Sequence, residues 1–148
     1  MPVILEAYGN AVIGLAPLLK GLHARLVAID GRDGSGKTTL GRYLAWHFNC
    51  TLLETDLFLV PGQGNPKYRN DDLARIISGR LNDDSPIIVE SVLALDLFDS
   101  LGMQRDYWLH ITNTKHGGCE ALMPKYIEYE TRRKPTECAD TAITVSVL

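Results

Sequence analysis

The chain has 148 residues, a length that predicts a single domain over residues 1–148 with its own hydrophobic core. Hydrophobic residues make up 45% of the sequence and charged residues 22%, which is typical of a soluble globular protein. The formal net charge of -3 argues against a nucleic-acid-binding surface, because such surfaces carry an excess of lysine and arginine. The three cysteines are far apart and lack metal-ligand spacing, so we expect free thiols in the reducing cytoplasm.

The N-terminal segment, residues 1–24, predicts a helix that packs on the domain rather than a targeting or membrane segment. It lacks a basic start, and polar residues interrupt it well short of the ~20 apolar residues that span a membrane. Its apolar residues recur every three or four positions, as on one face of an amphipathic helix: Ile4, Tyr8, Val12 and Leu15. Pro17 is expected to end or kink this helix. A helix that binds a partner is the alternative interpretation.

Along the rest of the chain, short apolar runs alternate with helical patterns. Strands are predicted over residues 25–30, 51–56, 86–90, 105–112 and 141–147. Helices are predicted from about Lys37 to about Phe48, from an N-cap at Asn70 to about Leu81, around 93–100, and on both sides of Pro124. The segment 118–135 is a candidate lid. This alternation predicts an α/β sandwich with a mostly parallel sheet and helices on both faces.

The sequence GRDGSGKT (31–38) matches the phosphate-loop pattern G-x-x-x-x-G-K-[ST] and lies between a predicted strand and a predicted helix. Its glycines let backbone N–H groups turn inward, where they form an anion site with the N-terminus of the following helix. The Lys37 ammonium can reach the β- and γ-phosphates of a nucleotide, and the Thr38 hydroxyl can bind Mg²⁺. The predicted nucleotide-binding residues are Gly31, Arg32, Asp33, Gly34, Ser35, Gly36, Lys37, Thr38 and Thr39. A glycine-rich turn with an exposed lysine is the alternative.

Two acidic residues stand at the ends of predicted strands, Asp56 after the second and Glu90 after the third. In a doubly wound sheet, ligands collect at the carboxyl ends of the strands. Phosphoryl transfer to an alcohol needs a carboxylate beside the acceptor oxygen and a site for Mg²⁺. We therefore predict Asp56 as the base beside the acceptor and Glu90 as the metal-site carboxylate, acting through bound water. The alternatives are a turn cap for Asp56 and a structural carboxylate for Glu90.

Other polar residues are weaker candidates. Arg132 belongs to a short basic run in the candidate lid and could stabilise charge during phosphoryl transfer, although such runs are usually solvated surface. Tyr68 and Arg69 stand in the loop before the second long helix and could contact an acceptor, with exposed loop side chains as the alternative. For Arg32 and Asp33, only the backbone is expected to matter.

Three sequence elements occur in an order that resembles the uridine kinase-like group of small P-loop kinases: VAIDGRDGSGKTTL (27–40), then Asp56-Leu57-Phe58, then PIIVESVLALDL (86–97). The resemblance covers roughly residues 25–98. It implies a P-loop kinase fold with a five-stranded parallel sheet in the order 2-3-1-4-5.

The same resemblance implies an ATP-dependent kinase that uses Mg²⁺ and phosphorylates a hydroxyl of a small molecule, such as a nucleoside or a cofactor precursor. It gives Asp56 the role of acceptor base, and Lys37 and Thr38 the phosphate and metal roles. The arginine-rich lid of the family is here reduced to Arg132 and Arg133. An ATP-binding regulatory module or a degenerate kinase without phosphotransfer therefore stays open as an alternative.

A GTP-binding switch is disfavoured. Such a protein needs the guanine motif N/T-K-x-D, and Asn113-Thr114-Lys115 begins in a similar way, but Gly117 stands where the aspartate is required. The predicted partner is a small-molecule hydroxyl acceptor. Neither nucleic acid nor a membrane is expected, and a homodimer is left open.

Overall fold

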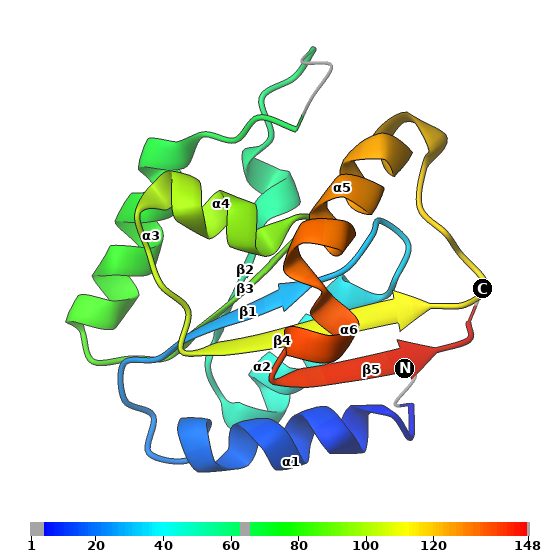
Figure 1. Ribbon diagram of the computed structural model, residues 1–148. Helices are drawn as coiled ribbons and strands as arrows, with labels where there is room; N and C mark the ends of the chain where they lie inside the picture. Colours follow the sequence, from blue (N-terminus) through cyan, green and yellow to red (C-terminus); the bar gives the residue numbers. More distant parts are fainter. Residues whose placement is uncertain (1–4, 63–65, 148) are drawn as a thin grey trace.

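The structure is a computed structural model that describes residues 5–62 and 66–147. Within these residues, one parallel sheet has the strand order β2-β3-β1-β4-β5 (Figure 1). The strands are β1 (Leu26–Asp30), β2 (Thr51–Glu54), β3 (Ile87–Ser91), β4 (Tyr107–Asn113) and β5 (Thr141–Val145). The parallel sheet and the order 2-3-1-4-5 are therefore confirmed.

Helices cover both faces of this sheet, so the fold is a three-layer α/β sandwich (Figure 1). One face carries α1 (Tyr8–Leu19) and α2 (Lys37–Phe48). The other face carries α3 (Asn70–Asn82), α4 (Ala94–Leu101), α5 (Met123–Arg133) and the short α6 (Pro135–Cys138). Two 3₁₀ helices are short: η1 (Thr55–Phe58) follows β2, and η2 (Glu120–Leu122) precedes α5.

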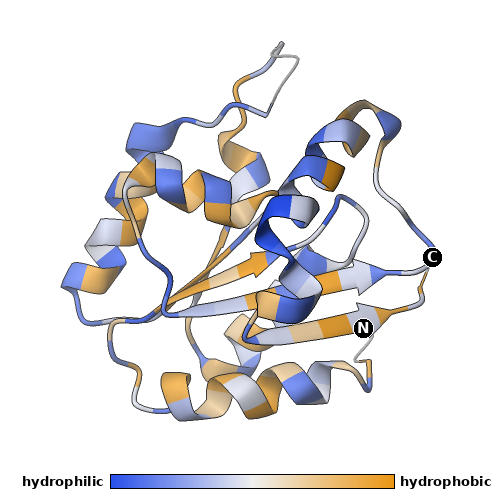
Figure 2. Cartoon of the chain, in the orientation of Figure 1, coloured by the Kyte–Doolittle hydropathy of each residue, from blue (hydrophilic) through white to orange (hydrophobic). Residues whose placement is uncertain are grey.

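The central strand β1 supplies side chains to both hydrophobic layers. Val27 and Ile29 pack with α1 and α2, whereas Leu26 and Ala28 pack with α3, α4 and α5. A strand that is buried on both faces reads as a continuous apolar run, and Figure 2 shows hydrophobic residues along β1 and β5. The same packing fixes the carboxyl ends of β1, β2 and β3 at one edge of the sheet.

Helix α1 exists as predicted but differs in detail. Its buried side is made by Tyr8, Ala11, Leu15 and Leu19. Val12 is only partly buried, and Ile4 lies outside the described residues. The helix ends at Leu19, so Pro17 lies inside its last turn rather than at its end. Proline removes one backbone donor there, and the helix closes normally because the Lys20 N–H bonds to the Ala16 carbonyl.

Helix α3 corrects a sequence prediction, whereas the helices around Pro124 confirm one. The N-cap of α3 is Arg69 rather than Asn70, and no side chain caps this helix. The Asn70 amide instead donates to Ser100 Oγ at 3.4 Å, so tertiary contact replaces the local cap. Helical residues lie on both sides of Pro124, as predicted: η2 precedes it, and α5 contains it in its first turn, where proline does not interrupt helical hydrogen bonds.

All three cysteines carry free thiols, with Cys50 partly buried and Cys119 and Cys138 exposed. In the parts of the chain that the structure describes, no helix has both the length and the apolar character needed to cross a membrane.

Candidate functional site

The candidate site lies where β1 ends and α2 begins, and residues 31–36 form the turn between them. Gly34 and Gly36 have φ angles of 75° and 96°, which glycine adopts without the steric cost that other residues meet. A side chain at Gly31 would approach the Ile111 carbonyl to 2.5 Å, so glycine is required there by close packing. The strand–loop–helix context of a phosphate loop is therefore present.

The first residues of α2 face the carboxyl end of β3. Thr38 Oγ1 donates a hydrogen bond to Glu90 Oε1 at 3.1 Å. Lys37 is buried, and its ammonium donates to the Arg32 carbonyl at 3.5 Å. Glu90 is 1% exposed, and its second oxygen, Oε2, has no hydrogen-bond partner among the described residues. The structure thus brings together the three residues predicted for phosphate and metal binding.

The environment of Glu90 explains its electrostatics. Burial raises the pKa of Glu90 above the ordinary carboxyl value, and the nearby Lys37 ammonium opposes this rise. An unpaired oxygen on a buried carboxylate is costly, and this oxygen is free to accept a contact from a cation. A hydroxyl and a carboxylate are the hard oxygen ligands that suit Mg²⁺. No group of three metal-ligating side chains occurs in the described residues, but Mg²⁺ held by one or two protein ligands does not need one.

The predicted acceptor residues Asp56 and Tyr68 lie near the end of β3, because Thr55, the residue before Asp56, donates a hydrogen bond to the Glu90 carbonyl at 3.1 Å. Asp56 belongs to η1, directly after β2, and is exposed. Burial is the main cause that raises the pKa of both Tyr68 and Glu90, and the charge of Asp56 adds to both shifts. Ser91 Oγ donates to the Tyr68 hydroxyl at 3.3 Å, which fixes this ring next to the end of β3. Asp56 and Tyr68 therefore belong to the same site as Glu90.

The two arginines predicted for the site are both held by protein partners. The Arg69 guanidinium donates to the Leu57 carbonyl at 2.8 Å and so lies along η1. Arg132 donates to both carboxylate oxygens of Asp96, at 2.8 and 2.7 Å. None of their hydrogen bonds within the described residues reaches the phosphate loop. The predicted catalytic role of Arg132 and substrate role of Arg69 stay predictions. The role of Arg132 would require its pairing with Asp96 to change, whereas Arg69 already lies next to Asp56 through its contact with Leu57.

The expectation that only the backbone of Arg32 and Asp33 matters is wrong. The Arg32 guanidinium forms a two-pronged ion pair with Glu130, with N–O distances of 2.6 and 2.8 Å. Asp33 accepts hydrogen bonds from the Tyr126 hydroxyl at 2.5 Å and the Cys119 N–H at 2.9 Å. Although burial opposes them, these bonds lower the pKa of Asp33. Both side chains thus fasten the phosphate loop to the segment predicted as a lid.

A buried polar cluster next to the phosphate loop was missed by the sequence predictions. Asp30 ends β1 with no exposed surface, and its carboxylate accepts hydrogen bonds from Trp108 Nε1 at 2.8 Å, His110 Nδ1 at 2.6 Å and the Tyr129 hydroxyl. Burial, and then the Asp30 charge, raise the pKa of Tyr129. The available signal was an aspartate that ends an apolar run directly before Gly31.

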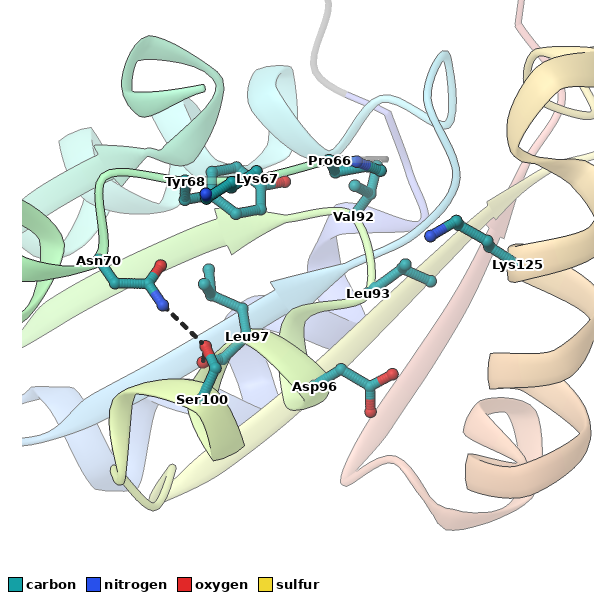
Figure 3. Close-up of a pocket in the computed structure, with 10 residues that line it drawn as sticks. All are labelled: Pro66, Lys67, Tyr68, Asn70, Val92, Leu93, Asp96, Leu97, Ser100 and Lys125. Atoms are coloured by element: carbon teal, nitrogen blue, oxygen red, sulfur yellow. Dashed lines mark hydrogen bonds between the residues drawn. The ribbon is translucent and has the colours of Figure 1, made fainter. Parts of the chain in front are cut away.

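Two cavities open beside residues of the candidate site. The first has a volume of about 440 Å³ and lies between α4, the start of α5 and the segment before α3 (Figure 3). Its lining residues are Pro66, Lys67, Tyr68, Asn70, Val92, Leu93, Asp96, Leu97, Ser100 and Lys125. The second has about 340 Å³ and lies between the phosphate loop, through Arg32 and Ser35, and the ends of β4 and α5. We call them the first and the second cavity.

We compared the chain with family models, curated proteins and solved structures. No family model matches the chain, and no curated protein matches it. Among solved structures, the crystal structure of TT1252 from Thermus thermophilus aligns with a TM-score of 0.45 and 13% sequence identity, covering 84% of this chain and 90% of that one.

Proposed function

We propose that the chain is an ATP-dependent phosphotransferase that moves the γ-phosphoryl group to a hydroxyl of a small molecule. The position of Tyr68 carries this proposal. The Tyr68 hydroxyl is hydrogen-bonded to Ser91, the neighbour of Glu90, and Tyr68 also lines the first cavity. Phosphate-binding groups and a cavity of the size that holds small molecules therefore adjoin each other.

The donor half of the proposed site is the phosphate loop. Its backbone N–H groups and the Lys37 ammonium bind and orient the β- and γ-phosphates of ATP. Thr38 and Glu90 would hold Mg²⁺, and the unpaired Glu90 Oε2 supports this assignment. The metal supplies charge neutralisation at the phosphate oxygens when it is bound. The second cavity, which the loop itself lines, is our assignment for the nucleoside part of ATP.

The acceptor half consists of the first cavity together with Asp56. Asp56 accepts the proton of the acceptor hydroxyl while that oxygen forms a bond to the γ-phosphorus. The bond between this phosphorus and the bridging oxygen of ADP breaks, and ADP leaves with the bond's electron pair. The exposed position of the Asp56 side chain suits this role because an acceptor hydroxyl can approach it from solvent.

Two variants test the assignment of donor and acceptor roles. Lys37→Ala should weaken ATP binding by about 10- to 100-fold, because it removes a charge-assisted contact to phosphate. Asp56→Asn should bind ATP as the wild type does but lower phosphotransfer by about 10²- to 10⁴-fold. ATP affinity is measured by calorimetry and transfer by product formation, with Asp71→Asn as the control for an exposed carboxylate near the site. Wild-type transfer by Asp56→Asn would contradict the assigned base.

One observation favours a second function, an ATP-binding module without transfer. Arg132 and Arg133 both pair with Asp96, so the basic run of the predicted lid is engaged away from the phosphate loop. Under this alternative, ATP raises the melting temperature by mass action, but no hydroxyl compound is phosphorylated. A parallel melting measurement with GTP distinguishes a GTP-binding switch from both.

A further inference from the structure

The charges that line the first cavity do not cancel. Its lining contains Lys67, Lys125 and Asp96. Asp96 accepts hydrogen bonds from Arg132 at 2.7 and 2.8 Å and from Arg133 at 2.7 Å, and these contacts lower its pKa. Asp96 is therefore engaged by arginines, which also pair with Glu128 and Asp99 outside the lining. Within the lining itself, two lysines stand against this one paired carboxylate, so the lining carries a net positive charge in a chain whose net charge is -3.

Lys125 is the informative member of the pair. It is partly buried, whereas Lys67 is exposed, and neither ammonium has a hydrogen bond or ion pair with any described residue. Many guanidinium groups of the protein do have carboxylate partners: those of Arg32, Arg42, Arg75, Arg132 and Arg133. Figure 3 shows Lys125 reaching from α5 towards Leu93, into the cavity. It also stands in the first turn of α5, where the helix dipole disfavours a cation unless an anion is nearby.

The opposite wall of the cavity has a different character. Val92, Leu93 and Leu97 give it an apolar surface, and Asn70 and Ser100 add a hydrogen-bonded polar pair, with an N–O distance of 3.4 Å. Leu93 has a φ of 49°, a left-handed conformation that costs a leucine about 1–2 kcal/mol. Residues held in such conformations cluster at ligand sites. The cavity therefore offers a cationic end, an apolar wall and hydroxyl-binding groups.

From these features we infer that the acceptor is an anionic hydroxy compound, whose carboxylate or phosphate group binds Lys125, with Lys67 as a second cation. Its reacting hydroxyl lies towards Tyr68 and Asp56. This inference rests on the proposed phosphotransfer, and it selects acidic acceptors over neutral sugars and nucleosides. Lys125 is a binding residue in this account, and it takes no part in the transfer of the proton.

Matched pairs of ligands test the inference without nucleotide present. Ribose 5-phosphate is compared with ribose, and gluconate with sorbitol, by calorimetry at low ionic strength. We expect at least one anionic compound to bind about tenfold or more tightly than its neutral partner, because it gains a charge-assisted hydrogen bond. Lys125→Met should abolish this preference, and Lys125→Arg should retain most of it. Lys20→Met, at an exposed lysine beyond the end of α1, is the matched control.

The outcomes separate the sources of the anion and the two proposals. A preference for gluconate alone identifies the ligand group as a carboxylate. A preference for ribose 5-phosphate alone identifies it as a phosphate. The inference is overturned if neither anion binds, or if the neutral partners bind equally well. It is also overturned if the preference for the anion survives Lys125→Met, because the phosphate loop would then be the binding site. Anion binding at Lys125 without transfer from ATP contradicts the proposed function alone. Transfer to neutral acceptors only contradicts this inference alone.

Discussion

Glu90 is expected to be a residue that the protein keeps at the expense of its stability. Its carboxylate is 1% exposed, and Oε2 has no partner in the described residues, a situation that costs about 1–3 kcal/mol. Glu90→Gln keeps the shape and the oxygen that Thr38 contacts but removes the charge. We therefore expect the variant to be more stable than the wild type by about 1 kcal/mol at neutral pH, or about 2–4 °C in melting temperature.

The pH dependence gives this prediction its sign. The pKa of Glu90 is raised by burial, so the folded protein holds this proton more tightly than the unfolded chain does. Stability contributed by Glu90 is then present at low pH and is lost as pH rises from the unfolded value of 4.5 through the folded value. The advantage of Glu90→Gln should accordingly appear at pH 7 and shrink towards pH 4.

Urea unfolding at several pH values measures this effect in the absence of nucleotide and metal. Glu120→Gln, at an exposed position, is the control and should change stability by less than about 0.5 kcal/mol. In the same preparation, ATP turnover by Glu90→Gln should fall by about 10- to 100-fold, as is usual when a group that supports a metal site is changed. A destabilised variant, or a stability gain that is the same at pH 4 and pH 7, would refute the reasoning.

Two further predictions concern parts of the protein outside the transfer site. Tyr129→Phe removes one of the donors to the buried Asp30 carboxylate and should lower the free energy of unfolding by about 1–3 kcal/mol in urea, and an unchanged midpoint would contradict this role. Burial raises the pKa of Cys50 to about 11. A thiol reagent at pH 8 should therefore modify the exposed Cys119 and Cys138 quickly and Cys50 only after unfolding. Equal rates of modification at all three cysteines would contradict this prediction.

The elements around the phosphate loop were predictable because their signals are local. Helix α2 begins at Lys37 and ends at Phe48, as predicted, since the glycine-rich loop fixes its start and Leu40 and Leu44 mark its buried side. Glu90 was recognisable because it ends a continuous apolar run, the pattern of a strand buried on both faces. The strand order came from resemblance to a family, because periodicity alone does not say which strands are neighbours.

Contacts between distant segments were not predictable in this way. Arg32 and Glu130 are 98 residues apart, and Asp30 and Tyr129 are 99 apart, so no local pattern connects them. These pairs connect α5, which lies in the candidate lid, to the phosphate loop and to the end of β1. The prediction of Asn70 as the N-cap of α3 was wrong for a related reason, because Asn70 contacts Ser100 on another helix.

The most direct measurement of the central claim follows the γ-phosphate of ATP. The protein is incubated with Mg²⁺, ATP labelled at its γ-phosphate, and hydroxyl compounds that include gluconate, ribose 5-phosphate, nucleosides and sugars. Our account predicts label on the hydroxyl of an organic acceptor, strongly reduced in Lys37→Ala and in Asp56→Asn. Label that stays on bound ATP, or passes only to inorganic phosphate, would contradict the account.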